Sequence, residues 1–233
     1  MTKRAGKWLT EWVKTIVIAL IAWFTISTLL LQSFHIISSS MENTLLVGDV
    51  LWVNKMLYGA ELPLIHVHMP SIREPRRGEI VIFESVETEG LAVVKRIIGM
   101  PGDTIAMEKG VLIRDGRRID EPWVEQGNRP MESDSAARAQ IRAWQVGRLV
   151  RGDAATYAPD PNNWGPMVVP RDSFFMMGDN RRESYDSRYW GFLPRRNIRG
   201  KTLITYFSYD PNTYKPLPVI TNIRWGRFFD VPH

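Results

Sequence analysis

The pattern of apolar and polar positions divides the 233-residue chain near residue 35. Residues 15–31 carry no charge over 17 positions, and the apolar run extends through Phe34 to about the 20 residues that cross a bilayer core. The run is apolar on all faces, which disfavours a helix half-buried in a soluble core. The pattern therefore predicts a single transmembrane helix over residues 15–34.

The charges beside this run predict its orientation. Residues 1–14 contain four cations and one acid, so the positive-inside rule places them in the cytoplasm and residues 35–233 outside it. A cleavable secretory signal also has a basic start and an apolar middle, and residues 38–40 would suit its cleavage site. The apolar run is longer than an ordinary signal core, so we expect a retained anchor. The cations are Lys3, Arg4, Lys7 and Lys14.

Beyond the anchor, the pattern changes to short runs rich in Val, Ile and aromatic residues, separated by Gly, Pro and Asp. Such runs are typical of a mainly β, mostly antiparallel domain. Asp115-Gly116 lies between two of them and predicts a hairpin with a type I′ turn. The predicted strands cover residues 50–53, 80–83, 91–98, 111–113, 174–177 and 203–207.

The middle of the domain has a different character. Residues from about 121 to 170 are polar and irregular, which predicts a loop-rich insertion in the β framework. One short helix is expected over residues 135–144.

Composition narrows the possible chemistry. With 44% hydrophobic residues the chain can build a core, and the absence of Cys excludes disulfides, thiolate zinc sites and cysteine nucleophiles. The net charge is +5, but Lys and Arg are dispersed among Asp and Glu. Nucleic-acid binding requires a concentrated basic patch, whereas anionic lipid headgroups explain the same charge.

The stretch SSSMENTLLVGD, residues 38–49, follows the predicted membrane exit directly. A serine cluster is ordinarily a solvated turn or a helix cap. Ser40 is also a candidate nucleophile held at the membrane surface, if a base can be found. None of the four His residues has a recognisable Ser-His-Asp setting, so we looked for another base.

Lys95 is the candidate base, because it lies in the apolar run LAVVKRIIG. Period-two alternation places Lys95 and Arg96 on opposite faces of a strand, so one of these cations must be paired or point toward apolar groups. A desolvated lysine loses its proton more easily and can activate a serine hydroxyl. The alternative is that Lys95 extends from an edge strand to water.

Two further segments carry side chains that could take part in chemistry. His66 and His68 share one face of an extended segment, but no acid or third His supports a metal site, and we expect ordinary surface imidazoles and no cofactor. Residues 177–191, MGDNRRESYDSRYWG, form a predicted loop. Loops on a β scaffold often carry sites. Here Asp186 can pair with Arg188, and Ser184 offers a hydroxyl to orient an amine.

Together these segments resemble the motif boxes of bacterial type I signal peptidases (leader peptidases), which are Ser-Lys dyad serine proteases. The resemblance covers the anchor and nearly all of the following chain, except the middle insertion. Asn43 departs from the family pattern, which has proline there; this residue shapes a turn and has no chemical role. The matching segments, in order, are SSSMENTLLVGD, GDVLWVNK, KRIIGMPGD and GDNRRESYDSR.

The resemblance implies a role for each matching residue. Ser40 is the nucleophile and Lys95 the general base. Ser38 joins the Ser40 backbone N–H in the oxyanion hole, and Ser184 positions the Lys95 amine. Asp186 and Arg188 form a structural ion pair that supports the loop. Shallow substrate pockets, which admit only small side chains, are lined by Phe34, Ile36, Met41, Leu45, Ile82 and Val94.

The implied function is that of a membrane-anchored serine endopeptidase that removes signal peptides from exported preproteins after Ala-x-Ala sequences. It implies a single-pass protein of the cytoplasmic (inner) membrane, with the lipid bilayer, preproteins and a nearby translocon as partners and no nucleic acid. One alternative is a peptidase of the same Ser-Lys type dedicated to conjugation or pili. Self-cleaving SOS repressors share the dyad but lack an anchor. Another alternative is a non-catalytic anchored β domain.

The C-terminal segment IRWGRFFDVPH combines aromatic residues with two arginines. This combination suits a lipid headgroup interface, and equally the edge of a core. The hypothesis is that the domain without its anchor still binds anionic vesicles through Phe228 and Phe229.

Overall fold

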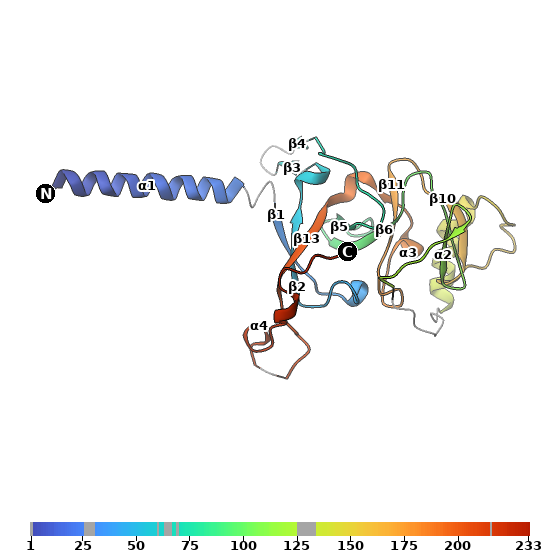
Figure 1. Ribbon diagram of the computed structural model, residues 1–233. Coiled ribbons are helices and arrows are strands. Elements are labelled where there is room, and N and C mark those ends of the chain that lie inside the picture. The colour runs from blue at the N-terminus through green and yellow to red at the C-terminus, as the bar shows by residue number, and fades with distance from the viewer. Residues whose placement is uncertain are drawn as a thin grey trace.

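A long helix extends away from a β body in the computed structural model, which describes residues 2–25, 31–59, 61–62, 67–68, 70–124, 134–214 and 216–233 (Figure 1). The helix, α1 (Thr2–Thr25), overlaps the predicted anchor over residues 15–25. Residues 26–30 of that anchor lie outside the described residues. From Leu31 the chain is a strand instead of a helix, because its backbone pairs with a neighbouring strand. No helix in the described ranges combines the length and hydropathy needed to cross a bilayer.

The main sheet has seven strands in the order β1-β2-β13-β5-β6-β11-β12, and every neighbouring pair is antiparallel. This confirms the mostly antiparallel β prediction. A separate pair, β3 and β4, lies outside this sheet. The strands are β1 (Leu31–His35), β2 (Asp49–Asn54), β3 (Glu61–Leu62), β4 (Val67–His68), β5 (Ile80–Glu84), β6 (Ala92–Gly99), β11 (Ser173–Met177), β12 (Leu193–Pro194) and β13 (Ile198–Ser208).

Strand β13 is the largest departure from the predicted boundaries, since it begins at Ile198 and not at residue 203. Its first residues pair with β5 and the remainder pairs with β2. The early part contains Arg199, Gly200 and Lys201, which lack the apolar signal of a strand. Pairing with β5, and not local propensity, therefore extends this strand at its start.

A second sheet has four strands in the order β10-β7-β8-β9. The predicted hairpin is confirmed: β8 (Val111–Arg114) pairs with β9 (Arg117–Arg118), and Asp115 and Gly116 have φ angles of 53° and 76°. Strands β7 (Thr104–Glu108) and β10 (Trp164–Val168) were not predicted. The β10 run contains Pro166, which is tolerated because β10 lies at the sheet edge.

The insertion, residues 121–170, is more regular than its composition indicates. Helix α2 (Ser135–Gln145) confirms the predicted short helix, and its N-cap Asp134 accepts the Ala137 N–H at 2.7 Å. Strand β10 closes the insertion. Shorter helices occur at η2 (Ser39–Met41), η3 (Met56–Tyr58), η4 (Val146–Arg148), α3 (Ser187–Trp190), η5 (Arg195–Asn197), α4 (Pro218–Thr221) and η6 (Trp225–Arg227).

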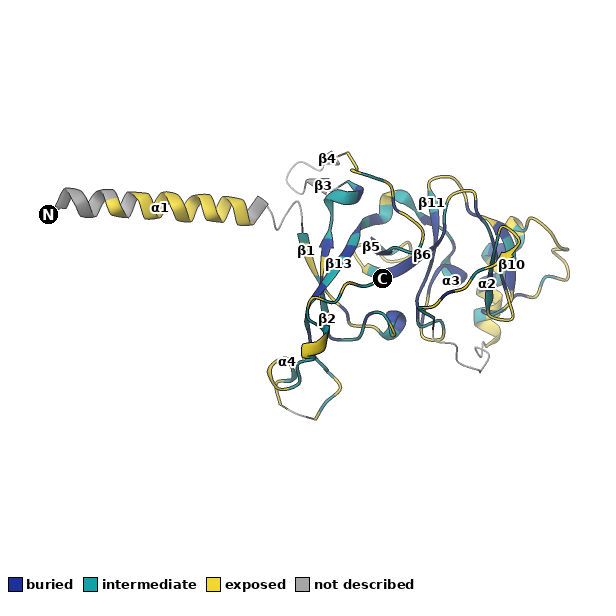
Figure 2. Ribbon diagram, viewed as in Figure 1, coloured by how far each residue is buried: buried dark blue, intermediate teal, exposed yellow. Residues whose placement is uncertain are grey.

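Buried residues gather on the strands of both sheets, while the described residues of α1 are exposed (Figure 2). One apolar cluster lies inside the curve of β1, β2, β5 and β6, and includes Met41 and Leu45. Another joins the small sheet to β11 and includes Trp164 and Phe175. The segment that contains Ser40 is therefore tied to the main sheet by its own apolar side chains.

Candidate active site

Ser40 lies in the short helix η2, and only 5% of the residue is exposed. The flanking chain is held by two backbone hydrogen bonds, from Ile36 N to Asp49 O at 2.8 Å and from Gly48 N to Ile36 O at 2.9 Å. Met41 and Leu45 are fully buried in the core below. Local backbone pairing and apolar burial thus present the Ser40 hydroxyl at a fixed position.

Lys95 meets Ser40 from strand β6, although 55 residues separate them in the chain. Its amine, Nζ, donates a hydrogen bond to Ser40 Oγ at 2.6 Å and another to the Val94 carbonyl at 3.0 Å. The residue is only 3% exposed, on a strand that lies between β5 and β11. The alternative that Lys95 extends from an edge strand to water is therefore wrong.

The environment favours the neutral form of the Lys95 amine. Burial is the largest cause and lowers the pKa of Lys95 to about 8, because an ammonium group loses hydration in the interior. The negative charge of Asp186 partly opposes this shift, and the positive charge of Arg188 adds to it. At neutral to alkaline pH, a substantial fraction of Lys95 can therefore accept a proton.

Both adjacent cations of β6 are buried, each in a different way. Arg96 is 1% exposed and points to the opposite face, where it donates to Asp179 at 2.6 and 2.8 Å. Its guanidinium also lies over the Trp123 ring, 4.3 Å from the centroid. Thr44 donates to the same Asp179 carboxylate at 2.5 Å. This cluster, which the sequence analysis did not find, links the Lys95 strand to the turn that follows Ser40.

The Gly178–Gly191 loop packs directly against Ser40. A Cβ atom at Gly178 would lie 2.3 Å from the Ser40 carbonyl oxygen, so only glycine fits there. Asn180 donates from its backbone N–H to Ser40 O and from its side chain to Ser39 O, both at 3.2 Å. The sequence analysis overlooked Gly178 and Asn180. Their signal was the turn-forming GDN sequence within a segment already singled out.

Asp186 and Arg188 form the expected ion pair, with Nε 2.8 Å from Oδ1. Burial alone would raise the pKa of Asp186, but the Arg188 charge and the hydrogen bonds to the carboxylate overcome it and lower the pKa. One of these bonds comes from Gly178 N at 3.1 Å. The pair therefore ties the two ends of the loop together.

Two further hydroxyls with predicted roles, those of Ser38 and Ser184, lie near the Ser40–Lys95 contact. Ser38 Oγ is 3.4 Å from Ser40 Oγ, at the margin of a hydrogen bond. The buried Ser184 Oγ makes no hydrogen bond to the Lys95 amine in the described part of the chain, and it acts instead on Asp186, whose pKa it helps to lower. Its role in positioning that amine stays a prediction.

The six residues expected to line the substrate pockets are brought together by the fold. Phe34 packs against a single buried cluster that contains the other five. Phe34 is part-buried, whereas the remainder are almost fully buried. The cluster comprises Ile36, Met41, Leu45, Leu51, Val53, Ile80, Ile82 and Val94.

The two histidines whose side chains are described bond to groups other than Ser40 and Lys95. His66 lies outside the described residues, and the side chain of His68 is likewise not described. His35 bonds to Tyr209 at 3.2 Å, and His233 bonds to the Val231 carbonyl at 2.7 Å. Within the described ranges, no group of three or more acidic or His side chains is arranged to hold a metal ion.

Known proteins share these features. Residues 9–207 match the family model described as signal peptidase, peptidase S26. The signal peptidase I of Pseudomonas aeruginosa is 32% identical over 227 residues, covering 92% of this chain and 78% of that protein. The signal peptidase I of Bacillus licheniformis is 30% identical over 203 residues, covering 87% of this chain and 90% of that protein.

Among solved structures, a signal peptidase I from Enterococcus faecalis is 26% identical and matches with a TM-score of 0.37, covering 56% of this chain and 98% of that one. The family match spans the nucleophile turn, the Lys95 strand and the Gly178–Gly191 loop, which the geometry above joins into one site. The chain therefore belongs to the signal peptidase family, peptidase S26.

Proposed function

We propose that the chain is a membrane-anchored serine endopeptidase that removes N-terminal signal peptides from exported preproteins with a Ser40–Lys95 dyad. One observation carries the proposal. The Lys95 amine lies 2.6 Å from Ser40 Oγ, and burial lowers the pKa of Lys95 to about 8. A buried amine with a lowered pKa beside a serine hydroxyl is the arrangement that activates a nucleophile.

In the acylation step, neutral Lys95 accepts the Ser40 proton while Oγ attacks the scissile carbonyl. The hydrogen bond from Nζ to Val94 O holds the amine beside Oγ, and for the proton transfer the Ser40 hydroxyl donates to the neutral amine. As the tetrahedral intermediate collapses, the lysine ammonium gives its proton to the departing amine of the mature chain. The signal peptide remains as an ester on Ser40.

In the second step, Lys95 takes a proton from water as the water oxygen attacks the ester carbonyl. The bond between the carbonyl carbon and Ser40 Oγ then breaks, the Lys95 ammonium returns the proton to Oγ, and the signal peptide leaves with a new C-terminal carboxylate. The negative oxygen in both steps needs hydrogen-bond donors. The Ser40 backbone N–H and the Ser38 hydroxyl, which is 3.4 Å from Ser40 Oγ, are the proposed donors.

Strand β6 offers a place for the substrate backbone. Ala92, Val93 and Val94 pair with β5 on one side, whereas the β11 pairing begins only at Arg96. A peptide in extended conformation can therefore add to the other side, next to Ser40. The neighbouring cluster around Met41 and Leu45 is tightly buried, which favours small substrate side chains.

The membrane location is part of the proposal. The uncharged stretch of residues 15–31 and the helix α1 precede Ser40 closely in the chain. A preprotein whose signal helix stays in the bilayer presents its cleavage site near the headgroups. Holding enzyme and substrate in one plane raises their effective concentration.

The test is cleavage of a preprotein ending its signal in Ala-x-Ala by the full chain in detergent. Ser40→Ala and Lys95→Met are each expected to abolish cleavage without unfolding, and the double variant to be no worse than either. Ser39→Ala and Lys109→Met are the matched controls, since they make the same kinds of change at a serine and a lysine that are not members of the proposed dyad. Cleavage at the parent rate by Ser40→Ala would place the nucleophile elsewhere, and no cleavage by the parent chain would favour the non-catalytic anchored β domain.

A further inference from the structure

Helix α2 of the insertion contacts the Gly178–Gly191 loop, next to α3 (Figure 1). Trp144 Nε1 donates to the Arg188 carbonyl at 2.8 Å, and Gln145 Nε2 approaches the same oxygen at 3.4 Å. Gln145 is itself held by the Tyr157 hydroxyl, which donates to its Oε1 at 2.5 Å. Two side chains of the insertion thus bind the backbone of a residue beside the active site.

A second contact lies one helical turn earlier. Gln140 Nε2 donates to the Tyr185 hydroxyl at 2.5 Å, and this hydroxyl donates to Glu87 at 2.9 Å. Residues four apart lie on one face of a helix, so Gln140 and Trp144 present the same face of α2 to the loop. Tyr185 follows Ser184 directly, so this contact fixes the loop where it passes the site.

A third contact comes from the start of the insertion. Glu121 forms an ion pair of 2.5 Å with Arg181, and both side chains are nearly buried. Arg181 also donates to the Gly178 carbonyl at 3.1 Å. The loop is therefore held by the insertion near its beginning, middle and end.

The loop so held carries groups that act on Lys95. Asp186 and Arg188 both influence the Lys95 ammonium electrostatically, and Gly178 closes over Ser40. The Arg188 guanidinium is bound by Asp186, while its carbonyl is bound by Trp144. A shift of the Arg188 backbone would consequently move the Asp186–Arg188 ion pair and let water reach the Lys95 amine.

We propose that the insertion supports catalysis by fixing the Gly178–Gly191 loop, with Trp144 as the main positioning residue through its hydrogen bond to the Arg188 carbonyl. This inference rests on the proposed function. It gives the insertion a task in the reaction without any contact to the substrate.

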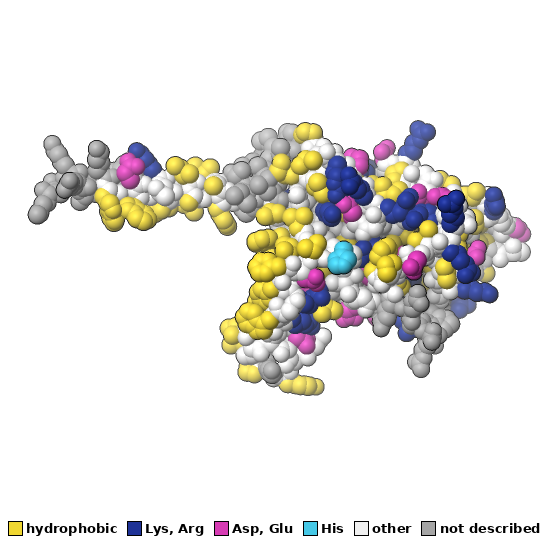
Figure 3. Space-filling view, viewed as in Figure 1, with side chains coloured by type: hydrophobic (Ala, Val, Ile, Leu, Met, Phe, Trp, Pro, Cys, Tyr) yellow, Lys and Arg dark blue, Asp and Glu magenta, His cyan; other side chains and the backbone are white. Residues whose placement is uncertain are grey.

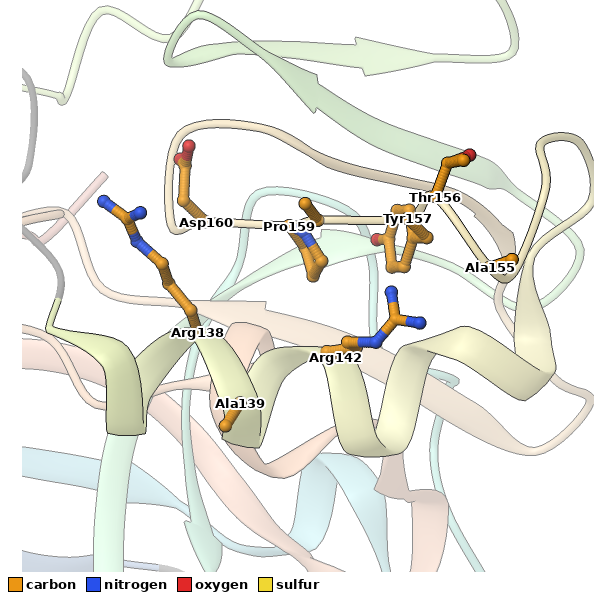
Figure 4. A pocket seen from close by; sticks show the side chains of 9 residues that line it. Arg138, Ala139, Arg142, Ala155, Thr156, Tyr157, Pro159 and Asp160 are labelled. Atoms are coloured by element: carbon orange, nitrogen blue, oxygen red, sulfur yellow. The ribbon is translucent and has the colours of Figure 1, made fainter.

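The opposite face of α2 supplies a contrast. Arg138 and Arg142 point toward the segment that carries Tyr157 and Pro159, and these residues line a pocket of about 380 Å³ (Figure 4). Arg142 donates to the Ala154 carbonyl at 2.6 Å within the insertion. Arg142→Gln therefore perturbs α2 without touching the loop.

The decisive comparison is Trp144→Phe against Trp164→Phe. Both rings pack near Phe175, but the buried Trp164 Nε1 has no hydrogen-bond partner in the described part of the chain. Each change removes a similar volume, and only Trp144→Phe removes a bond to the loop. We expect Trp144→Phe to lower kcat roughly fivefold to tenfold near pH 7, with KM little changed.

The pH dependence of the rate distinguishes a role of Trp144 in positioning the loop from a general loss of activity. A looser loop hydrates Lys95 and raises the apparent pKa of the rate, so the loss in Trp144→Phe is expected to be smaller at pH 10 than at pH 7. Trp164→Phe and Arg142→Gln should keep the parent profile. If Trp144→Phe does not fold, Gln140→Leu provides the test, because Gln140 is exposed. This variant is expected to raise the apparent pKa of the rate in the same way.

The inference is overturned if the pH profile of Trp144→Phe equals that of Trp164→Phe. If Trp144→Phe is unfolded, a pH profile of Gln140→Leu equal to that of the parent overturns it. Neither result affects the dyad. Full cleavage by Ser40→Ala would instead overturn the proposed function, whatever the tryptophan variants do.

Discussion

A single lysine shows how burial lowers the pKa of an amine. Lys95 is almost completely enclosed, and its amine bonds to Ser40 Oγ and the Val94 carbonyl. Each unit by which its pKa falls costs the protonated form about 1.4 kcal/mol. That cost is the source of reactivity, because it makes the neutral amine accessible in the range where exposed lysines are charged.

The first prediction at this scale concerns pH. Lys95 must be neutral to accept a proton, so kcat/KM is expected to rise about tenfold per pH unit below a pKa of about 8 and to level off above it. The midpoint of this rise would lie at about pH 10.4 for an unperturbed lysine and at about pH 6.5 for a histidine. The measurement is kcat/KM from pH 5.5 to 10.5. A limb near 6.5 that disappears in His35→Ala would replace Lys95 with a histidine base.

The second concerns Ser38, which is exposed and lies 3.4 Å from the nucleophile oxygen. Loss of one oxyanion donor costs on the order of 10² to 10³ in rate. Ser38→Ala is therefore expected to be slow but measurable, and Ser38→Thr to retain more activity. Single-turnover kinetics would detect the loss, and activity of Ser38→Ala equal to the parent would place the oxyanion donors elsewhere.

At the scale of elements, strand β6 organises two polar systems that face opposite ways. Lys95 serves the active site, while Arg96 joins Asp179 and Thr44 on the other face. A buried ion pair of this kind gives little net stability, but removing one partner leaves a costly unpaired charge. A third group of polar side chains surrounds Glu79, which lies just before β5 and pairs with Lys201 of β13.

Glu79 provides the prediction at this scale. It accepts from Tyr58 at 2.6 Å and from Arg73 at 2.5 Å, and lies 3.1 Å from Lys201. Burial raises its pKa, but these partners prevail and lower it to about 2. The stabilisation is therefore present above about pH 4.5 and lost as the pH falls toward 2.

Glu79→Gln is expected to lower the free energy of unfolding by roughly 1–3 kcal/mol at pH 7 and to reduce the stability difference between pH 5 and pH 2. Urea unfolding at several pH values measures both effects. Glu108→Gln, at an exposed strand end, is the control. An unchanged acid dependence in Glu79→Gln would show that other carboxylates dominate acid unfolding.

At the scale of the whole molecule, apolar side chains collect on the side of the β body from which α1 extends and near α4 (Figure 3). Trp225 and Phe229 are 72% and 70% exposed, whereas Phe228 is part-buried and stacks on Trp225. The two arginines of this segment differ from the expectation. Arg227 pairs with the buried Asp49 and Arg224 with Asp210, so they are engaged inside the protein.

This surface predicts lipid binding by aromatic insertion. A chain starting at Leu31 is expected to float with anionic vesicles, and Trp225→Ser with Phe229→Ser to reduce the bound fraction severalfold. Val150→Ser with Val168→Ser, also exposed but located in the insertion, is the control. Equal binding by both double variants would contradict the prediction.

The sequence by itself determined the local structure and the candidate chemistry. Short runs rich in Val, Ile and aromatic residues located six of the thirteen described strands, Asp115-Gly116 determined a hairpin, and helix α2 was found in a polar segment, because these features depend on residues close in the chain. Ordered motifs identified Ser40 and Lys95 as candidates. The edge strand β10 and the first part of β13 were missed, because their pairing partners are distant in the chain.

Only the tertiary structure decided how these candidates meet. It closed the 55-residue separation between Lys95 and Ser40 to a 2.6 Å contact. It also showed that both cations of β6 are buried, and it brought Trp144 of the insertion to the Arg188 carbonyl. Periodicity identifies the face on which a side chain lies, but burial and charge pairing depend on which distant segment covers that face.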